Sequence, residues 1–152
     1  MEKHNLYEFM TLALREAEIA GLENEVPVGA VLLSPAGEIL AADHNRTRQY
    51  NDPTAHAEIL VLRRAAKILN NYRLPEAQLV VTVEPCLMCA GAVIQARLGQ
   101  VVFGATDPKA GALGSLYDLS KDQRLNHRFE VASGIREREC RDLMQKFFQE
   151  RR

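Results

Sequence analysis

Two short motifs restrict the fold of this chain more than any other feature of its sequence: a His-Ala-Glu tripeptide that starts at His56 and a Pro-Cys-Leu-Met-Cys run that ends at Cys89. Together they supply one imidazole and two thiols, from His56, Cys86 and Cys89, which are ligand types that zinc prefers. Three protein ligands leave the fourth position of a tetrahedral zinc ion open for water, as in a catalytic rather than a structural site. Glu58 is then not needed as a ligand and is available to move the protons of that water. The fold must therefore bring two distant segments together.

The spacing within each motif predicts where the side chains point. Cys86 and Cys89 are three residues apart at the start of an expected helix, so both sulfur atoms lie on one face, where the helix N-terminus stabilises thiolates. His56 and Glu58 are two residues apart, which corresponds to about 200° in a regular helix, so their side chains would point apart. The pair can face one site if His56 lies at the edge of its helix, or if Glu58 reaches around the ion. Pro and Thr at 53–54 are able to cap the helix, which is consistent with His56 at the edge.

A structural zinc site and a redox-active Cys-x-x-Cys pair are the alternative interpretations of the cysteine motif. A closed structural site needs a fourth ligand, and none of the candidates, His44, His127 and Cys140, stands in a ligand-like spacing with the others. A thioredoxin-type pair does not require the histidine. We therefore expect His44 and His127 to form hydrogen bonds or to pack, and Cys140 to be buried in a helix. The sequence favours a catalytic metal site.

Composition limits the partners and the location that we expect. With 152 residues, the chain is expected to form a single domain over residues 1–152. A net charge of −1 gives no general support for nucleic-acid binding, so an RNA partner would need a local basic patch. Three cysteines, two of them in one motif, favour metal chemistry over a disulfide framework. No apolar run is long enough to cross a bilayer and the polar N-terminus does not resemble a secretory signal, so we expect a cytoplasmic protein without a membrane partner.

The order of apolar patterns predicts an α/β domain. Apolar residues recur at helical spacing in some segments and form short continuous runs in others, and turn residues at 34–37 join two of these runs into a hairpin. Residues 111–126 are irregular and rich in Gly, Ser and Asp, which is typical of a functional loop. The order predicts a three-layer α/β/α fold with a central mixed sheet of about five strands. Helices are expected at 6–21, 55–69, 86–98 and from 136 to the end, where Leu143, Phe147 and Phe148 face inward, and strands at 28–33, 39–42, 79–83, 101–103 and 129–132.

The metal motifs are part of a longer resemblance to a known family. A His-x-Glu motif followed by Pro-Cys-x-x-Cys is the pattern of the zinc-dependent nucleobase deaminases. The segments around these motifs are similar to the bacterial tRNA adenosine deaminases, one branch of that superfamily, over nearly the whole chain. The resemblance implies a cytidine-deaminase-like fold, one zinc ion per subunit and a homodimer. The matching segments are 25–30, 52–58, 81–91, 101–105, 114–116 and 126–128.

The resemblance also implies a reaction and the residues that carry it out. The reaction is hydrolysis of the wobble adenosine of a tRNA anticodon to inosine, in which zinc-activated water attacks C6 and Glu58 is the catalytic proton shuttle. Asn45 is implied to contact the base, and Val28 and Ala57 to bind the substrate, although a buried strand position explains Val28 equally well. Asp107 matches a segment near the substrate sugar, although an Asp-Pro pair is also typical of a turn.

Contacts with a tRNA anticodon stem-loop would need basic side chains. Arg46 and Arg48 come directly after the expected base contact, in a stretch that departs from the commoner family sequences. Lys109 lies near the segment matched to the sugar. Arg151 and Arg152 end the last helix, where a solvated helix end is the alternative explanation, because basic residues suit the helix dipole there. These five residues are the predicted RNA contacts.

Two other functions are compatible with the motifs. The same zinc chemistry on a free base or nucleoside, such as guanine or cytosine, agrees with the net charge, and its binding would not depend steeply on salt as phosphate contacts do. A zinc-binding module without catalysis would tolerate the substitution Glu58→Ala, which should abolish turnover in either enzyme.

Overall fold

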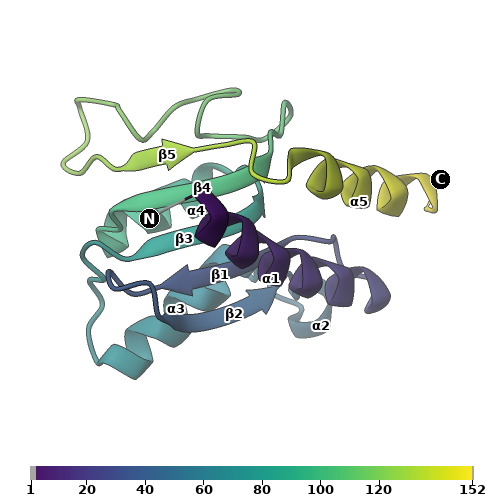
Figure 1. Ribbon diagram of the computed structural model, residues 1–152, viewed down its shortest axis with the longest axis horizontal. Helices are drawn as coiled ribbons and strands as arrows, with labels where there is room; N and C mark the ends of the chain where they lie inside the picture. The colour runs from purple at the N-terminus through teal and green to yellow at the C-terminus, as the bar shows by residue number, and fades with distance from the viewer. Residues whose placement is uncertain (1–2, 152) are drawn as a thin grey trace.

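The computed structural model describes residues 3–151, and these form one five-stranded sheet with helices on both faces (Figure 1). The strand order in the sheet is β2-β1-β3-β4-β5. The predicted α/β class, with a mixed sheet between two helical layers, is therefore confirmed. The strands are β1 (Gly29–Leu33), β2 (Ile39–His44), β3 (Gln78–Val83), β4 (Gln100–Ala105) and β5 (Glu130–Ala132), and the helices are α1 (Lys3–Leu22), α2 (Thr47–Tyr50), α3 (Ala57–Leu69), α4 (Leu87–Ala96) and α5 (Glu137–Gln149).

The sheet is mixed because its two halves are connected differently. β1 pairs antiparallel with both β2 and β3, whereas β3, β4 and β5 run parallel. The predicted hairpin joins β1 to β2, and Gly37 in its turn has a φ of 87°, which glycine adopts without strain. Helix α4 makes the crossover from β3 to β4 that parallel neighbours require. The segment between β3 and α4, which carries the first cysteine of the metal motif, therefore lies at the C-terminal edge of the parallel strands.

Two apolar clusters hold the helices on the sheet, one on each face. α3 and α4 pack against Leu79 and Val81, and α1 and α5 pack on the opposite face against Val80. Neighbouring side chains of β3 point to opposite faces, and burying each one contributes about 1.5–3 kcal/mol. A Cβ at Gly104 of β4 would overlap Cys140, because α5 packs directly over this strand. The predicted burial of Cys140 in the last helix is confirmed, and burial raises the pKa of its thiol to about 12.

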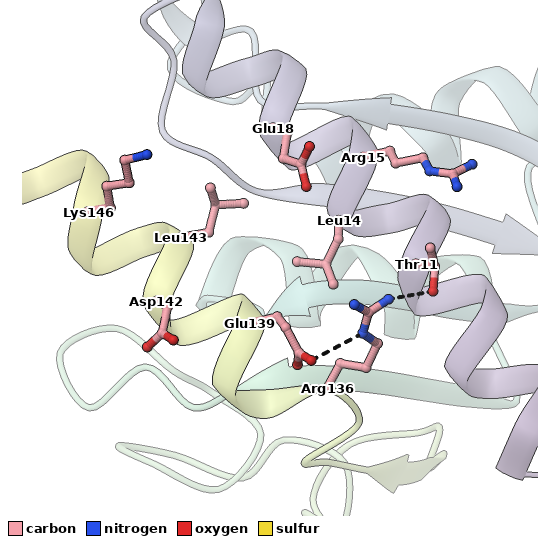
Figure 2. A pocket seen from close by; sticks show the side chains of 9 residues that line it. All are labelled: Thr11, Leu14, Arg15, Glu18, Arg136, Glu139, Asp142, Leu143 and Lys146. Carbon is pink, nitrogen blue, oxygen red and sulfur yellow. Dashed lines mark hydrogen bonds and ion pairs between the residues drawn. The ribbon is translucent and has the colours of Figure 1, made fainter.

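Helix α5 is fastened to α1 near its first turn, and its C-terminal end extends away from the sheet (Figure 1). Figure 2 shows the groove between the two helices, where the guanidinium of Arg136 donates to the hydroxyl of Thr11 and lies 3.7 Å from the carboxylate of Glu139. The same guanidinium stacks on the ring of Tyr7, 4.7 Å from its centroid, as a cation–π contact. None of the residues that line this groove belongs to the metal motifs. The groove is therefore separate from the predicted site.

The structure differs from the sequence predictions at two helices. The short helix α2 follows β2, where no helix is predicted. Phe148 is 46% exposed, so the prediction that it faces inward is wrong, whereas Phe147 is buried and Leu143 is packed against the α1 cluster. Adjacent residues of a helix point about 100° apart, so the two phenylalanines cannot both face the protein interior. Helix α5 ends at Gln149.

A long connection, residues 106–129, joins β4 to β5 with no helix or strand assigned to it in the described structure. It includes the segment predicted to be an irregular loop. Hydrogen bonds attach it to the cysteine motif: the amide of Ala112 donates to the carbonyl of Pro85 at 2.9 Å, and Gly111 forms an isolated β-bridge with Cys86. Within residues 3–151, no helix is long and apolar enough to cross a membrane.

Candidate metal centre

His56 lies immediately before α3, at its N-cap position, with extended backbone angles of φ −74° and ψ 152°. Glu58 is the second residue of the helix. Of the two alternatives for this pair, the structure therefore confirms that His56 is at the helix edge. The side chain of Asn45, directly after β2, accepts a hydrogen bond from the amide of Ala57 at 2.8 Å. This contact attaches the start of α3 to the end of the hairpin and so fixes the position of His56.

The cysteine motif has the same design at the start of α4. Cys86 is the N-cap residue, with φ −78° and ψ 177°, and Cys89 is in the first turn. Helix α4 therefore begins one residue later than predicted. Two helix N-termini converge here, and their positive ends suit the negative charge of thiolates.

The side chains of His56, Cys86 and Cys89 come together as the sequence predicts. Nδ1 of His56 lies 3.7 Å from Sγ of Cys86 and 3.4 Å from Sγ of Cys89, and all three atoms lie within 4.8 Å of one another. In a tetrahedral zinc site with Zn–S of about 2.3 Å and Zn–N of about 2.05 Å, the nitrogen and sulfur atoms are about 3.6 Å apart. The two measured separations bracket this value. The donor set and its spacing therefore fit a zinc ion.

Mutual hydrogen bonding shifts the protonation of the three side chains in a way that favours a cation. Hydrogen bonds from Cys89 and His56 lower the pKa of Cys86 to about 3, so this sulfur is a thiolate. The Cys86 thiolate in turn raises the pKa of Cys89, and its hydrogen bond raises the pKa of His56. The negative sulfur of Cys86 thus favours the protonated forms of Cys89 and His56. A divalent cation that displaces these protons relieves the competition, as metal binding to thiols does.

Glu58 lies beside the three ligand atoms and is buried, with 4% of its surface exposed. The pKa of its carboxyl is raised to about 7, mainly by burial and also by the nearby Cys86 thiolate, against the opposing effects of a backbone hydrogen bond and of His56. The carboxyl also contributes to the raised pKa of the Cys89 thiol, after the effects of Cys86 and of burial. A carboxyl in this environment is able to exchange a proton near neutral pH.

The structure brings three of the four predicted substrate residues together. The backbone amide of Asn45 donates to the carbonyl of Val28 at 3.1 Å, and its side-chain oxygen accepts from the backbone amide of Ala57. The three residues therefore form one hydrogen-bonded corner next to His56. All three are buried, and Val28 also belongs to the core cluster under α3. Asp107 lies after β4, where its carboxylate accepts from the amides of Lys109 and Ala110 in a turn. The turn alternative thus describes its local conformation.

The predicted RNA-contacting residues differ in their surroundings. The guanidinium of Arg46 is committed to internal contacts, because it forms an ion pair of 2.8 Å with the buried carboxylate of Asp43. Arg48 and Arg151 converge instead on Asn24: the first donates to its backbone carbonyl at 3.3 Å and the second to its side-chain oxygen at 3.0 Å. Residues far apart in sequence thus form one basic surface. Lys109 is exposed on the turn after β4, and Arg152 lies outside the described residues.

His44 is buried and takes part in a charged network away from the metal centre. Its ring nitrogens contact Glu16 at 2.9 Å and Glu23 at 2.7 Å. Glu16, Asp43 and His44 also have spacing that a metal could use, but Arg46 already pairs with Asp43. The imidazole is thus held between two carboxylates, and the expectation that it forms hydrogen bonds is confirmed.

The other candidates for a fourth structural ligand are also engaged elsewhere. The ring of His127 contacts the carbonyl of Leu98 at 2.7 Å, and Cys140 is buried against β4. The expected hydrogen-bonding role of His127 is confirmed. No residue predicted as an alternative ligand therefore completes a closed site with the described His-Cys-Cys set.

Two buried carboxylates near the site were missed at the sequence level. Glu25 accepts hydrogen bonds from the amides of Arg48 at 3.1 Å and Gln49 at 2.7 Å, which holds the start of α2. Glu84 makes similar contacts with the connection after β4. Glu84 is a single glutamate between an apolar run and a proline, whereas Glu25 lies in a polar stretch two residues before Pro27. Burying such a charge is costly unless it is hydrogen-bonded, and this was the available signal.

Comparisons with known proteins identify the family. A profile described as MafB19-like deaminase matches residues 4–152. The tRNA-specific adenosine deaminase of Bacillus subtilis is 48% identical over 144 residues, which cover 95% of this chain and 89% of that protein. This chain belongs to the tRNA-specific adenosine deaminase family.

Solved structures of deaminases have the same fold as this family member. One, from a study of A-to-I editing by tRNA deaminases at the wobble position of transfer RNA, has a TM-score of 0.86 and 47% identity, over 90% of this chain and 98% of that one. A guanine deaminase from Nitrosomonas europaea has a TM-score of 0.75 and 25% identity, over 93% of this chain and 83% of that one. The family member described here is thus more similar to the tRNA deaminase than to the enzyme for a free base.

Proposed function

We propose that this protein hydrolyses adenosine to inosine at the wobble position of a tRNA anticodon. The observation that carries the proposal is the His-Cys-Cys set with zinc-like spacing and a buried glutamate beside it, in a chain whose relatives are tRNA-specific adenosine deaminases. The proposed enzyme is a single domain of residues 1–152, acts in the cytoplasm and forms a homodimer.

The proposed cofactor is one zinc ion per subunit, held by His56, Cys86 and Cys89. When bound, the ion lowers the pKa of a water molecule from about 15.7 towards about 7, which makes hydroxide available at neutral pH. The two thiolates and the imidazole fix the centre at the junction of α3 and α4.

Glu58 moves the protons of the reaction. Its carboxylate takes a proton from the attacking water and gives it to N1 of adenine, while the remaining hydroxide adds to C6. Glu58 then takes the proton of the new C6 hydroxyl and gives it to the amino group. The amino group departs as ammonia, and the C6 carbonyl of inosine forms. Its position in the first turn of α3, two residues after His56, keeps the carboxyl next to the ligand atoms without making it a ligand.

The corner formed by Asn45, Val28 and Ala57 is proposed to receive the adenine base. The base must leave its stack in the anticodon loop to reach this corner, which costs least where it is already unpaired. The side-chain nitrogen of Asn45 offers a donor to a purine, while its oxygen accepts from the amide of Ala57. Asp107 is proposed to lie near the ribose, where a carboxylate or a backbone carbonyl is able to bind a 2′-hydroxyl.

The basic surface around Asn24 is proposed to bind phosphates of the stem-loop. Arg48 and Arg151 carry exposed guanidinium groups there, and Lys109 and Arg152 are proposed as further contacts. Arg46 is a weaker candidate because it is already paired with Asp43.

The test is to incubate zinc-loaded protein with an anticodon stem-loop that carries a wobble adenosine, and to measure inosine. Parallel reactions hold free adenosine, guanine and cytosine. Glu58→Ala serves as the inactive variant, and Glu130→Gln, at an exposed position of β5, is the matched control. Inosine in the stem-loop supports the proposal. Turnover of a free base with the RNA unchanged would instead assign the chain to the free-base deaminases.

A further inference from the structure

Glu84 is the residue between the end of β3 and the Pro85–Cys86 segment, and it has 3% of its surface exposed. One carboxylate oxygen accepts hydrogen bonds from the amide of Asp107 at 3.0 Å and from the hydroxyl of Ser115. The other accepts from the amides of Leu113 and Ser115, both at 3.0 Å. Four donors thus converge on one buried carboxylate. All four come from residues 107–115, which we call the 107–115 loop.

The same loop is packed against Glu84 so closely that one position allows no side chain. A Cβ at Gly111 would overlap the carboxylate of Glu84. The loop is also attached to the next two residues of the chain, through the Gly111–Cys86 bridge and the hydrogen bond from Ala112 to Pro85. Glu84 is therefore the centre of the contact between this loop and the segment that carries a metal ligand.

The loop depends on this contact because it has no regular secondary structure of its own between residues 107 and 115 beyond isolated bridges. A buried carboxylate that accepts several amide hydrogen bonds is favourable, whereas amides left without an acceptor are costly. Removing the carboxylate would release Asp107 at one end of the loop and Ser115 at the other. Such a release would move the proposed ribose contact relative to Cys86.

We propose that Glu84 is a positioning residue that holds the 107–115 loop in a fixed place relative to the metal ligand Cys86. It touches neither substrate nor metal in this role. It acts through the loop, whose Asp107 faces the substrate according to the proposed function, on which this inference rests. The contact sets the distance between the metal centre and the surface that receives the nucleoside.

Hydrogen exchange of the zinc-loaded protein tests the structural half of this proposal without any substrate. In Glu84→Gln, one oxygen is replaced by an NH2 group that cannot accept, so either the amide of Asp107 or the amides of Leu113 and Ser115 lose their acceptor and should exchange at least about tenfold faster. The strand amides of β4 should keep their protection, and the zinc content should equal that of the unmodified protein. Asp122→Asn is the matched control, because this carboxylate bonds locally to Arg124 in the same connection.

Kinetics on the anticodon stem-loop test the functional half. The value of kcat/KM should fall about 10- to 100-fold in Glu84→Gln, because a displacement of about 1 Å costs that much in positioned reactions. A partly unfolded preparation lowers kcat and leaves KM unchanged, whereas a displaced loop also raises KM. Ser115→Ala should show a smaller loss of the same kind, and the double variant should lose no more than Glu84→Gln alone.

Gly111→Ala provides an independent route to the same displacement, because it leaves the chemistry of Glu84 intact and removes only the space beside it. Gly21→Ala, where the new Cβ meets a neighbour at an ordinary 3.9 Å, is the control. Faster loop exchange together with a raised KM in Glu84→Gln and Gly111→Ala supports the proposal. Unchanged loop exchange, or faster exchange with unchanged KM, overturns it, and so does a loss of zinc without a change in the loop. If the unmodified protein forms no inosine, the proposed function fails, and the exchange data alone decide whether Glu84 holds the loop.

Discussion

The two ends of the Asn45 side chain have separable roles that a pair of substitutions distinguishes. Its oxygen accepts from the amide of Ala57 at 2.8 Å, and this amide, as the first of α3, has no acceptor within the helix. Its nitrogen is the proposed donor to adenine. Asn45→Ala removes both ends, whereas Asn45→Asp keeps an acceptor and removes the donor. The two variants should therefore differ in stability and agree in activity.

The size of the stability effect follows from burial. Asn45 is 8% exposed, so Asn45→Ala leaves the Ala57 amide without an acceptor, at a cost of about 2 kcal/mol. For a chain of this length, that lowers Tm by about 4–8 °C. Asn45→Asp should stay within about 1 kcal/mol of the unmodified protein, because the positive end of α3 stabilises a carboxylate. In both variants, kcat/KM for the stem-loop should fall at least about tenfold.

Thermal unfolding and inosine formation, both on zinc-loaded protein, measure the two effects. Asn71→Ala is the matched control, since the oxygen of Asn71 also accepts a backbone amide, that of Arg73 at 3.0 Å, but in an exposed loop. It should change stability by no more than about 0.5 kcal/mol. Equal Tm losses for Asn45→Asp and Asn45→Ala would refute the role of the oxygen. Full activity in Asn45→Asp would refute the role of the nitrogen.

Three further substitutions test other parts of the structure. Glu58→Gln should keep its zinc, measured by metal analysis, and lose at least about 100-fold in kcat; a variant that remains active would exclude the proton shuttle. Arg48→Gln should reduce the salt dependence of stem-loop binding by about 0.7–0.9 in the slope of log K against log salt, measured between about 50 and 200 mM, whereas Lys67→Gln on exposed α3 should not. His44→Leu removes the buried hydrogen-bond partner of two partly exposed carboxylates and should lower the free energy of unfolding by about 1.5–3 kcal/mol in urea titrations; a loss below about 0.5 kcal/mol would contradict the proposed contribution of this network.

Local chemistry made the metal centre predictable from sequence. The ligand types and the spacing of Cys86 and Cys89 identify a zinc-like set, and the angle between residues i and i+2 predicts that His56 lies at a helix edge if Glu58 is to share its site. The apolar pattern likewise predicts the five strands and the helices that cover them. Each of these motifs and elements can be recognised from residues that are close in sequence.

Features that depend on distant contacts were not predictable in the same way. Helix α2 has no apolar periodicity, and its start is held by Glu25 from more than 20 residues away along the chain. Arg46 looks free in the sequence, but the buried Asp43 pairs with it. Glu84 resembles any glutamate before a proline until the fold places four donors around it. In each case, one long-range hydrogen bond or ion pair decides the role of the residue.

The pairing of β3 has a consequence for how precisely the chain must be aligned. This strand leads into Cys86 through only Glu84 and Pro85, and both of its neighbours fix its register, with Val81 opposite Ala30 on one side and opposite Phe103 on the other. A slip by one residue shifts a strand by about 3.3 Å, which exceeds a Zn–S bond of about 2.3 Å, and also turns each side chain to the other face. The register of β3 in the sheet therefore determines the position of the metal ligand Cys86. The length of the chain from β3 to Cys86 is therefore fixed to the residue, whereas an insertion in the connection around residue 122 would leave this register unchanged.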